Sequence, residues 1–307
     1  MRAAPIAVPL TAVLLLGACG GEPPQPPSRS PSAVRSTTAP APTLPPERLA
    51  DLVAYDHARP LDVTVRGTTR EPTTGVTVTD LTYDGGSGEP VEAYLITPVR
   101  SPTRTLAGVV FAHGSGRDRS RFLDEAKAVA RRGALVLLPT VPMNMSADAA
   151  IDIAYVSRAV ITQRRALDVL AARPEVDRGR LGFVGHSWGA ILGAILAGAE
   201  PRLAAVVVAS FTKPVSRYFG STPQYREQIA VLDQHWWLAL HGNRRVLLQA
   251  GSLDSYHRGA DTDTLFAAIS GRKERRDYHL GHDLVEPPEP VNDRREFLTR
   301  VLGLART

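Results

Sequence analysis

A serine stands at the centre of the pentapeptide Gly185-His186-Ser187-Trp188-Gly189. The apolar run 181–184 before it predicts a buried strand, and the small residues 190–199 after it favour a helix. A serine on a sharp strand-to-helix turn exposes its hydroxyl, which can then act as a nucleophile. We expect a strained backbone at Ser187, with glycines at 185 and 189 because side chains there would collide with the neighbouring strand and helix. An accidental Gly/Ser turn is the alternative interpretation.

A serine hydroxyl is a weak nucleophile until a base takes its proton and a third group orients that base. Asp254 follows a strand predicted at 246–249, and His282 follows one predicted at 275–279. Both residues therefore lie in loops at the carboxyl ends of strands, downstream of Ser187 in the order Ser, Asp, His. Four neighbours compete for these roles; we expect His279 in its strand, Asp283 at the surface, and Asp261 and Asp263 as helix caps.

Acyl transfer by a serine also needs two amide donors for the oxyanion that forms on the substrate. Trp188, directly after the nucleophile, can supply one amide. The loop His113-Gly114-Ser115-Gly116 follows an apolar strand, and its glycines allow close approach, so we expect the second amide at Gly114 or Ser115. His113 and His186 are predicted to be structural. The histidines fall in no metal-ligand spacing, so no metal site is predicted.

The predicted elements alternate between strands and helices, which indicates the α/β class. Residues 76–83 and 91–96 alternate in polarity around a Gly/Asp-rich loop, as an antiparallel hairpin near a sheet edge does. Continuous apolar runs indicate strands buried on both faces of a parallel sheet, at 106–112, 134–138, 181–184, 203–209 and 246–248. Helices are predicted at 120–131, 147–173, 188–199 and 261–270.

The segment 211–245 interrupts this alternation and is rich in aromatic residues. It is predicted to cross the carboxyl edge of the sheet, with a helical part at about 224–240, and it could roof a pocket. Trp236 and Trp237 are accordingly candidate substrate-pocket residues. The alternative, equally supported, is that both tryptophans pack a surface helix onto the domain.

Residues 61–302 resemble the serine α/β-hydrolases, in particular the dienelactone-hydrolase-like and acyl-peptidase-like groups. The motifs that carry the resemblance are the hairpin, the loop 113–116, the pentapeptide 185–189 and the segments 251–254 and 281–282. The resemblance implies a mostly parallel sheet of about eight strands with helices on both faces. It also implies hydrolysis of carboxylic esters or related acyl bonds in a small substrate through an acyl-enzyme, without a cofactor. Dienelactone hydrolases use cysteine where this chain has Ser187, which argues against dienelactone as substrate.

The first residues resemble a bacterial lipoprotein signal. A charged start at Arg2, a short apolar stretch and the sequence Leu16-Gly17-Ala18-Cys19 predict cleavage before Cys19 and its lipidation. The chain would then divide into a signal peptide (1–18), a lipidated, Pro-rich spacer (19–46) and a hydrolase domain (47–307). Export and tethering at the extracytoplasmic membrane face are the expectation; an ordinary cleaved signal is the alternative. Cys19 is the only cysteine, so no disulfide can form within the chain.

The formal net charge of +5 comes mainly from scattered arginines. No basic stripe with interleaved aromatic residues is present, so nucleic-acid binding is not predicted. A rival to the enzyme is a non-catalytic envelope lipoprotein that binds a hydrophobic ligand in the same pocket; a structural role at the envelope has no motif in its favour. The sequence leaves the oligomeric state open.

Overall fold

The computed structural model describes residues 46–99 and 105–306. The predicted signal peptide, Cys19 and almost all of the spacer lie outside these residues, so the lipoprotein assignment and the domain boundaries stay predictions. Within the described ranges, no helix combines the length and the apolar character needed to cross a membrane.

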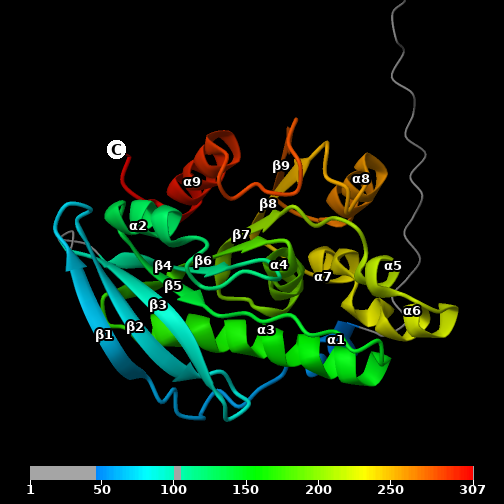
Figure 1. The fold of residues 1–307 in the computed structure, drawn as a ribbon, viewed down its shortest axis with the longest axis horizontal. Helices are drawn as coiled ribbons and strands as arrows, with labels where there is room; N and C mark the ends of the chain where they lie inside the picture. The colour runs from blue at the N-terminus through cyan, green and yellow to red at the C-terminus, as the bar shows by residue number, and fades with distance from the viewer. Residues whose placement is uncertain (1–45, 100–104, 307) are drawn as a thin grey trace, which may run out of the picture. The chain divides into compact units, whose positions relative to one another are not determined.

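A nine-stranded mixed sheet forms the centre of the molecule, in the order β1-β2-β3-β5-β4-β6-β7-β8-β9 (Figure 1). The pairs β1–β2, β2–β3 and β3–β5 are antiparallel, and the strands from β5 to β9 in this order are parallel to one another. The strands are β1 (Thr64–Glu71), β2 (Val76–Asp84), β3 (Pro90–Pro98), β4 (Leu106–Ala112), β5 (Ala134–Pro139), β6 (Val176–His186), β7 (Leu203–Ala209), β8 (Arg245–Gly251) and β9 (Lys273–Tyr278).

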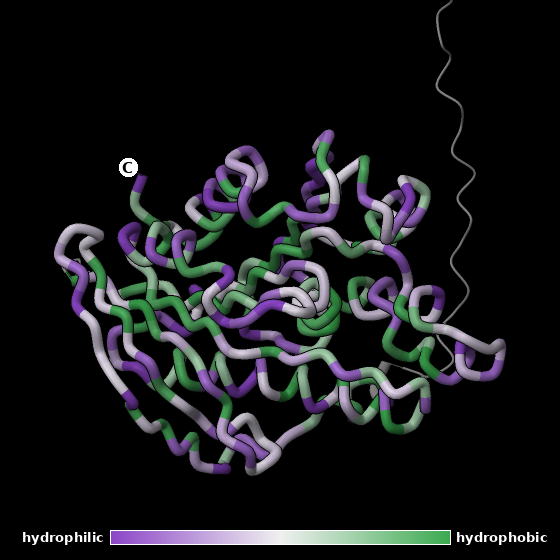
Figure 2. The backbone as a smooth tube through the Cα atoms, in the orientation of Figure 1, coloured by the Kyte–Doolittle hydropathy of each residue, from purple (hydrophilic) through white to green (hydrophobic). Residues whose placement is uncertain are grey.

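Helices cover both faces of the sheet. One apolar cluster joins a sheet face to α1, α3, α4 and α7, and a second joins the opposite face to α2 and α9. The helices are α1 (Pro46–Leu52), α2 (Leu123–Arg131), α3 (Ala149–Ala171), α4 (Trp188–Ala199), α5 (Val215–Phe219), α6 (Pro223–Ile229), α7 (Gln234–Ala239), α8 (Gly259–Ala268) and α9 (Pro288–Leu302), with a 3₁₀ turn at Ala230–Leu232. Every residue of β4 and β5 is buried, as their continuous apolar runs predict, and Figure 2 shows apolar residues concentrated in the central strands.

The predicted α/β class, the mostly parallel sheet and the hairpin are confirmed. The sheet has nine strands where about eight were expected. The additional strand is β1, with the polar sequence TVRGTTRE. It pairs only with β2 at the sheet edge, and its residues are exposed except for Glu71, so it lacks the apolar alternation by which a strand is recognised.

Candidate active site

The turn that carries Ser187 has the strained geometry that its sequence predicts. β6 ends at His186, α4 begins at Trp188, and Ser187 between them has φ 56° and ψ −113°. A Cβ atom at Gly185 would lie 2.0 Å from the Gly189 carbonyl oxygen, and one at Gly189 would lie 2.1 Å from the Ala112 carbonyl oxygen. Both glycines are therefore required sterically, because the turn packs against itself and against β4.

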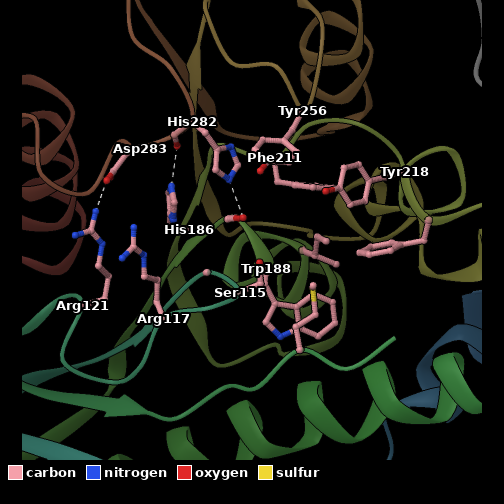
Figure 3. A pocket seen from close by; sticks show the side chains of 15 residues that line it. Ser115, Arg117, Arg121, His186, Trp188, Phe211, Tyr218, Tyr256, His282 and Asp283 are labelled. Atoms are coloured by element: carbon pink, nitrogen blue, oxygen red, sulfur yellow. Dashed lines mark hydrogen bonds and ion pairs between the residues drawn. The ribbon is translucent and has the colours of Figure 1, made fainter. Parts of the chain in front are cut away.

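Three polar side chains from distant segments meet at this turn. His282 Nε2 lies 2.8 Å from Ser187 Oγ, and His282 Nδ1 lies 2.7 Å from Asp254 Oδ2 (Figure 3). Asp254 follows β8 and His282 follows β9, so both extend from the carboxyl ends of parallel strands. The structure thus brings the sequence-predicted nucleophile, base and acid into one hydrogen-bonded chain.

Asp254 is held as an anion opposite the imidazole. Its side chain has no solvent exposure. Burial alone would raise its pKa, but hydrogen bonds from His282 and from the Tyr256 amide, 2.8 Å from Oδ1, outweigh burial and lower the pKa below its usual value. The loops of the acid and the base also touch: a Cβ atom at Gly251 would lie 2.3 Å from the Gly281 carbonyl oxygen. The carboxylate and the imidazole therefore have a fixed separation.

Two further histidines hold the site in place, as expected for structural residues. His186 Nε2 donates to the His282 carbonyl oxygen at 2.9 Å, and burial lowers the pKa of His186 to about 4. His113 Nδ1 donates to the Gly114 carbonyl oxygen at 2.8 Å, while its Nε2 accepts from the Val141 amide at 2.9 Å. Because each ring nitrogen of His113 has one fixed partner, its tautomer is fixed, and so is the loop that follows.

The candidate oxyanion donors face the same cavity as Ser187. Trp188 is the first residue of α4, so its amide has no acceptor within the helix. Gly114 approaches the turn so closely that a Cβ atom there would lie 3.0 Å from Ser187 Cβ. Gly114 and Ser115 line the cavity together with Ser187 and Trp188. Residues from two loops thus line the cavity next to Ser187 and are the candidates to supply the two amides.

The cavity has a volume of about 350 Å³. Its apolar wall comes from Met143, Ile191, Phe211, Tyr218, Phe219 and Tyr256, and its charged wall from Arg117, Arg121 and Asp283. The ring of Tyr256 packs on that of His282, with centroids 4.4 Å apart. Sequence reasoning missed most of these residues, although Tyr256 and Arg117 each lie two positions beyond a predicted site residue.

Trp236 and Trp237 do not line this cavity. Trp237 belongs to α7 and is buried; its Nε1 donates to the Val231 carbonyl oxygen at 2.9 Å, and its backbone packs on Gly198 of α4. Trp236 packs on the same apolar cluster. The geometry therefore corresponds to the alternative interpretation, in which both tryptophans pack a helix onto the domain. The aromatic residues of segment 211–245 that line the cavity are Phe211 and, from α5, Tyr218 and Phe219.

The competing acids and the competing histidine have other partners. Asp283 pairs with Arg121 and accepts from the Val285 amide, and Asp263 pairs with Arg275. Asp261 accepts from the Arg258 amide and so caps α8. His279 lies 3.4 Å from the Ser252 hydroxyl. Among the residues described, no group of three or more His, Cys, Asp or Glu is placed to hold a metal ion.

Several solved structures with this architecture are esterases. No family model matches the chain, and no curated protein is similar enough in sequence to match. An acetyl xylan esterase from a Paenibacillus species superposes with a TM-score of 0.68 at 20% identity, covering 84% of this chain and 92% of that one. Acetyl xylan esterase 1 from a Thermoanaerobacterium species gives 0.68 at 16% identity, covering 83% and 92%. The chain has the α/β-hydrolase fold. A glucuronoyl esterase from Solibacter usitatus is similar at a TM-score of 0.61 and 11% identity, covering 83% of this chain and 91% of that one.

Proposed function

We propose that this protein is a serine hydrolase that cleaves carboxylic esters or related acyl bonds through an acyl-enzyme. The observation that carries the proposal is a pair of linked hydrogen bonds at the edge of a cavity. Ser187 Oγ lies 2.8 Å from His282 Nε2, and His282 Nδ1 lies 2.7 Å from Asp254 Oδ2. The fold, shared with esterases, supports ester hydrolysis as the class of reaction.

In the proposed mechanism, His282 Nε2 takes the proton of Ser187 as its Oγ attacks the acyl carbonyl carbon. The carbonyl π electrons move to the oxygen, which accepts hydrogen bonds from the Trp188 amide and from an amide at Gly114 or Ser115. The tetrahedral intermediate collapses, and the leaving alcohol departs with the proton from Nε2. Water then repeats the sequence on the acyl-enzyme, with His282 as base, and releases the carboxylic acid and the free serine.

Asp254 has two functions in this scheme. Its hydrogen bond keeps the proton of neutral His282 on Nδ1, which leaves the Nε2 lone pair directed at the serine. Its negative charge stabilises the imidazolium that forms when His282 accepts the serine proton. Both effects depend on a carboxylate that stays ionised, and the hydrogen bonds that lower its pKa favour that form.

The direct test combines a fluorophosphonate probe with turnover of p-nitrophenyl esters by the domain starting near residue 47. We expect covalent labelling at Ser187, and loss of labelling and turnover in Ser187→Ala. Full activity in Ser187→Ala would refute the assignment. Tight retention of a hydrophobic ligand without any labelling would instead indicate the non-catalytic binding protein.

We also propose, from the sequence alone, that lipidation of Cys19 tethers the hydrolase at the extracytoplasmic face of the membrane. The test is fractionation of cells that express the full chain. A Cys19→Ala variant should leave the membrane fraction, and a variant that remains there as fully as the wild type would contradict the proposal.

A further inference from the structure

The cavity beside Ser187 has two chemically different sides (Figure 3). Phe211, Tyr218 and Tyr256 lie on one side of His282, and Arg117 and Arg121 lie on the other. A substrate that reaches Ser187 therefore lies between an aromatic surface and a pair of guanidinium groups.

The charged residues around Arg117 are committed to partners, and Arg117 is not. Asp118 accepts hydrogen bonds from the Ser120 amide and hydroxyl at 2.7 and 2.6 Å, and Arg119 pairs with Asp80 at 2.8 Å. Arg121 pairs with both Asp283 and Glu286. Within the described ranges, no ion pair or hydrogen bond of the Arg117 side chain is found, although this side chain lines the cavity.

The residues that line the cavity carry a formal charge of +1, from Arg117 and Arg121 against Asp283. Arg121 is shared between Asp283 and Glu286, the latter outside the lining, so among the described residues Arg117 is the lining guanidinium without a carboxylate partner. Asp254 lies behind His282 with no solvent exposure. An uncompensated arginine in a concave site attracts anions, and its planar fork matches the two oxygens of a carboxylate.

We propose that Arg117 binds an anionic group of the substrate, so that the preferred substrates are esters carrying a carboxylate on one side of the scissile bond and an apolar or aromatic group on the other. This inference rests on the proposed function. A carboxylate fits better than a phosphate monoester, because one unpaired arginine balances one negative charge and a phosphate carries nearly two. Arg117 follows the loop that holds Gly114 and Ser115, so a substrate seated in the oxyanion site would place its neighbouring group within reach of this loop.

The test compares matched pairs of esters. 4-Nitrophenyl hydrogen glutarate against 4-nitrophenyl valerate places the charge on the acyl side, and 3-acetoxybenzoate against phenyl acetate places it on the leaving group. We measure kcat/KM for each ester in the wild type, in Arg117→Gln and in Arg70→Gln. Arg70 is an exposed arginine of β1 outside the cavity, so its variant controls for the loss of one charge.

We expect Arg117→Gln to lower the anionic-to-neutral ratio of kcat/KM about tenfold in at least one pair, and Arg70→Gln to leave both ratios unchanged. Raising the salt concentration should lower the same ratio in the wild type but not in Arg117→Gln, because salt screens the arginine–carboxylate attraction. The carboxylic ester 4-nitrophenyl 3-(phosphonooxy)propanoate, whose acyl group ends in a phosphate monoester, should gain less from Arg117 than the glutarate.

Equal losses on charged and neutral esters would overturn the inference, because Arg117 would then act on the oxyanion or on the loop. Unchanged ratios in both pairs would overturn it as well. Fluorophosphonate labelling of Ser187 in the same samples separates the two proposals. If the wild type is not labelled, the proposed function itself fails; if it is labelled and the ratios do not change, only the anionic subsite fails.

Discussion

Replacing Asp254 with asparagine removes the charge of the third residue of the proposed triad and nearly preserves its shape. His282 Nδ1 and Asp254 Oδ2 are 2.7 Å apart, and the aspartate side chain has no solvent exposure. At an effective dielectric constant near 20, unit charges about 4 Å apart interact by about 4 kcal/mol. Losing this attraction to the imidazolium in the transition state would slow the reaction about 10³-fold.

The hydrogen bonds of the site add a second cost. The Tyr256 amide donates to Asp254 Oδ1, so an asparagine would place its carbonyl oxygen there and turn its NH₂ group toward His282. His282 Nδ1 would then have to accept, which moves the ring proton to Nε2, where it faces Ser187. That tautomer cannot take the serine proton, so the total loss in kcat should approach 10⁴-fold.

The assay is steady-state turnover of a p-nitrophenyl ester, with kcat and KM determined separately. We expect the loss in kcat, with KM nearly unchanged and the thermal midpoint close to that of the wild type. Asp283→Asn is the matched control, because this acid neighbours His282 in the chain but pairs with Arg121; its kcat should stay within about tenfold of the wild type. A loss below about 30-fold in Asp254→Asn would refute the electrostatic reasoning.

Three further predictions follow from the packing and from the buried charges. A Cβ atom in Gly114→Ala would meet Ser187 Cβ at 3.0 Å and His186 Nδ1 at 3.3 Å, so the loop must withdraw and kcat should fall about 10- to 100-fold in a protein with an unchanged circular dichroism spectrum; wild-type kcat would contradict this. Arg294→Met leaves buried Glu125 unpaired and should cost about 3–5 kcal/mol in urea unfolding, most of it regained in Arg294→Met/Glu125→Leu; no rescue would count against the pairing argument. Burial lowers the pKa of His186 and of His235 to about 4, against about 6.5 when unfolded, so both bind a proton on unfolding and stability falls as the pH drops from 6.5 to 4. Burial raises the pKa of Asp233 to about 6 despite hydrogen bonds from Ser216, so this residue releases a proton on unfolding between about pH 4 and 6, which opposes the loss of stability at low pH. Asp233→Asn should therefore enlarge the drop in the free energy of unfolding between pH 7.5 and pH 5, measured by urea titration. An equal drop in the variant and the wild type would contradict the assignment.

The residues of the site that could be predicted from sequence are those with strict local requirements. The turn at Ser187 demands glycines at fixed spacing, because a Cβ atom at 185 or 189 meets backbone within about 2 Å. Asp254 and His282 follow strands in a regular order along the sheet. Gly114 lies where the fourth strand ends. Each of these signals is carried by a few consecutive residues, so it is visible without tertiary contacts.

The cavity walls could not be predicted in the same way, since they depend on how loops distant in sequence fold over one another. Phe211 and Tyr218 line the cavity, whereas Trp237 of α7 is buried in the core, although all three belong to one aromatic segment. Aromatic composition alone does not distinguish a side chain that packs in the core from one that lines the cavity. The aromatic composition of the segment thus suggested Trp236 and Trp237 as pocket residues, but in the folded chain neither lines the cavity.

The C-terminal helix α9 is a further element that the sequence patterns do not predict. It begins at Pro288, within a Pro-rich stretch typical of a loop, yet proline is tolerated in the first turn of a helix. Its apolar residues Phe297, Leu298 and Leu302 pack on the sheet face opposite α3. The helix also carries Arg294, a nearly fully buried arginine that no sequence pattern marks as internal.

Arg294 connects this helix to the loop of His282, the proposed base. Its guanidinium binds Glu125 of α2 at 2.6 Å and donates to the Leu284 carbonyl oxygen at 2.7 Å, just beyond His282. From the other side, His186 holds the His282 carbonyl oxygen. The position of the imidazole thus depends on two side chains outside the Ser187–His282–Asp254 chain, namely Arg294 and His186. Variants of Arg294 should therefore affect kcat through the histidine loop even when the turn at Ser187 is intact.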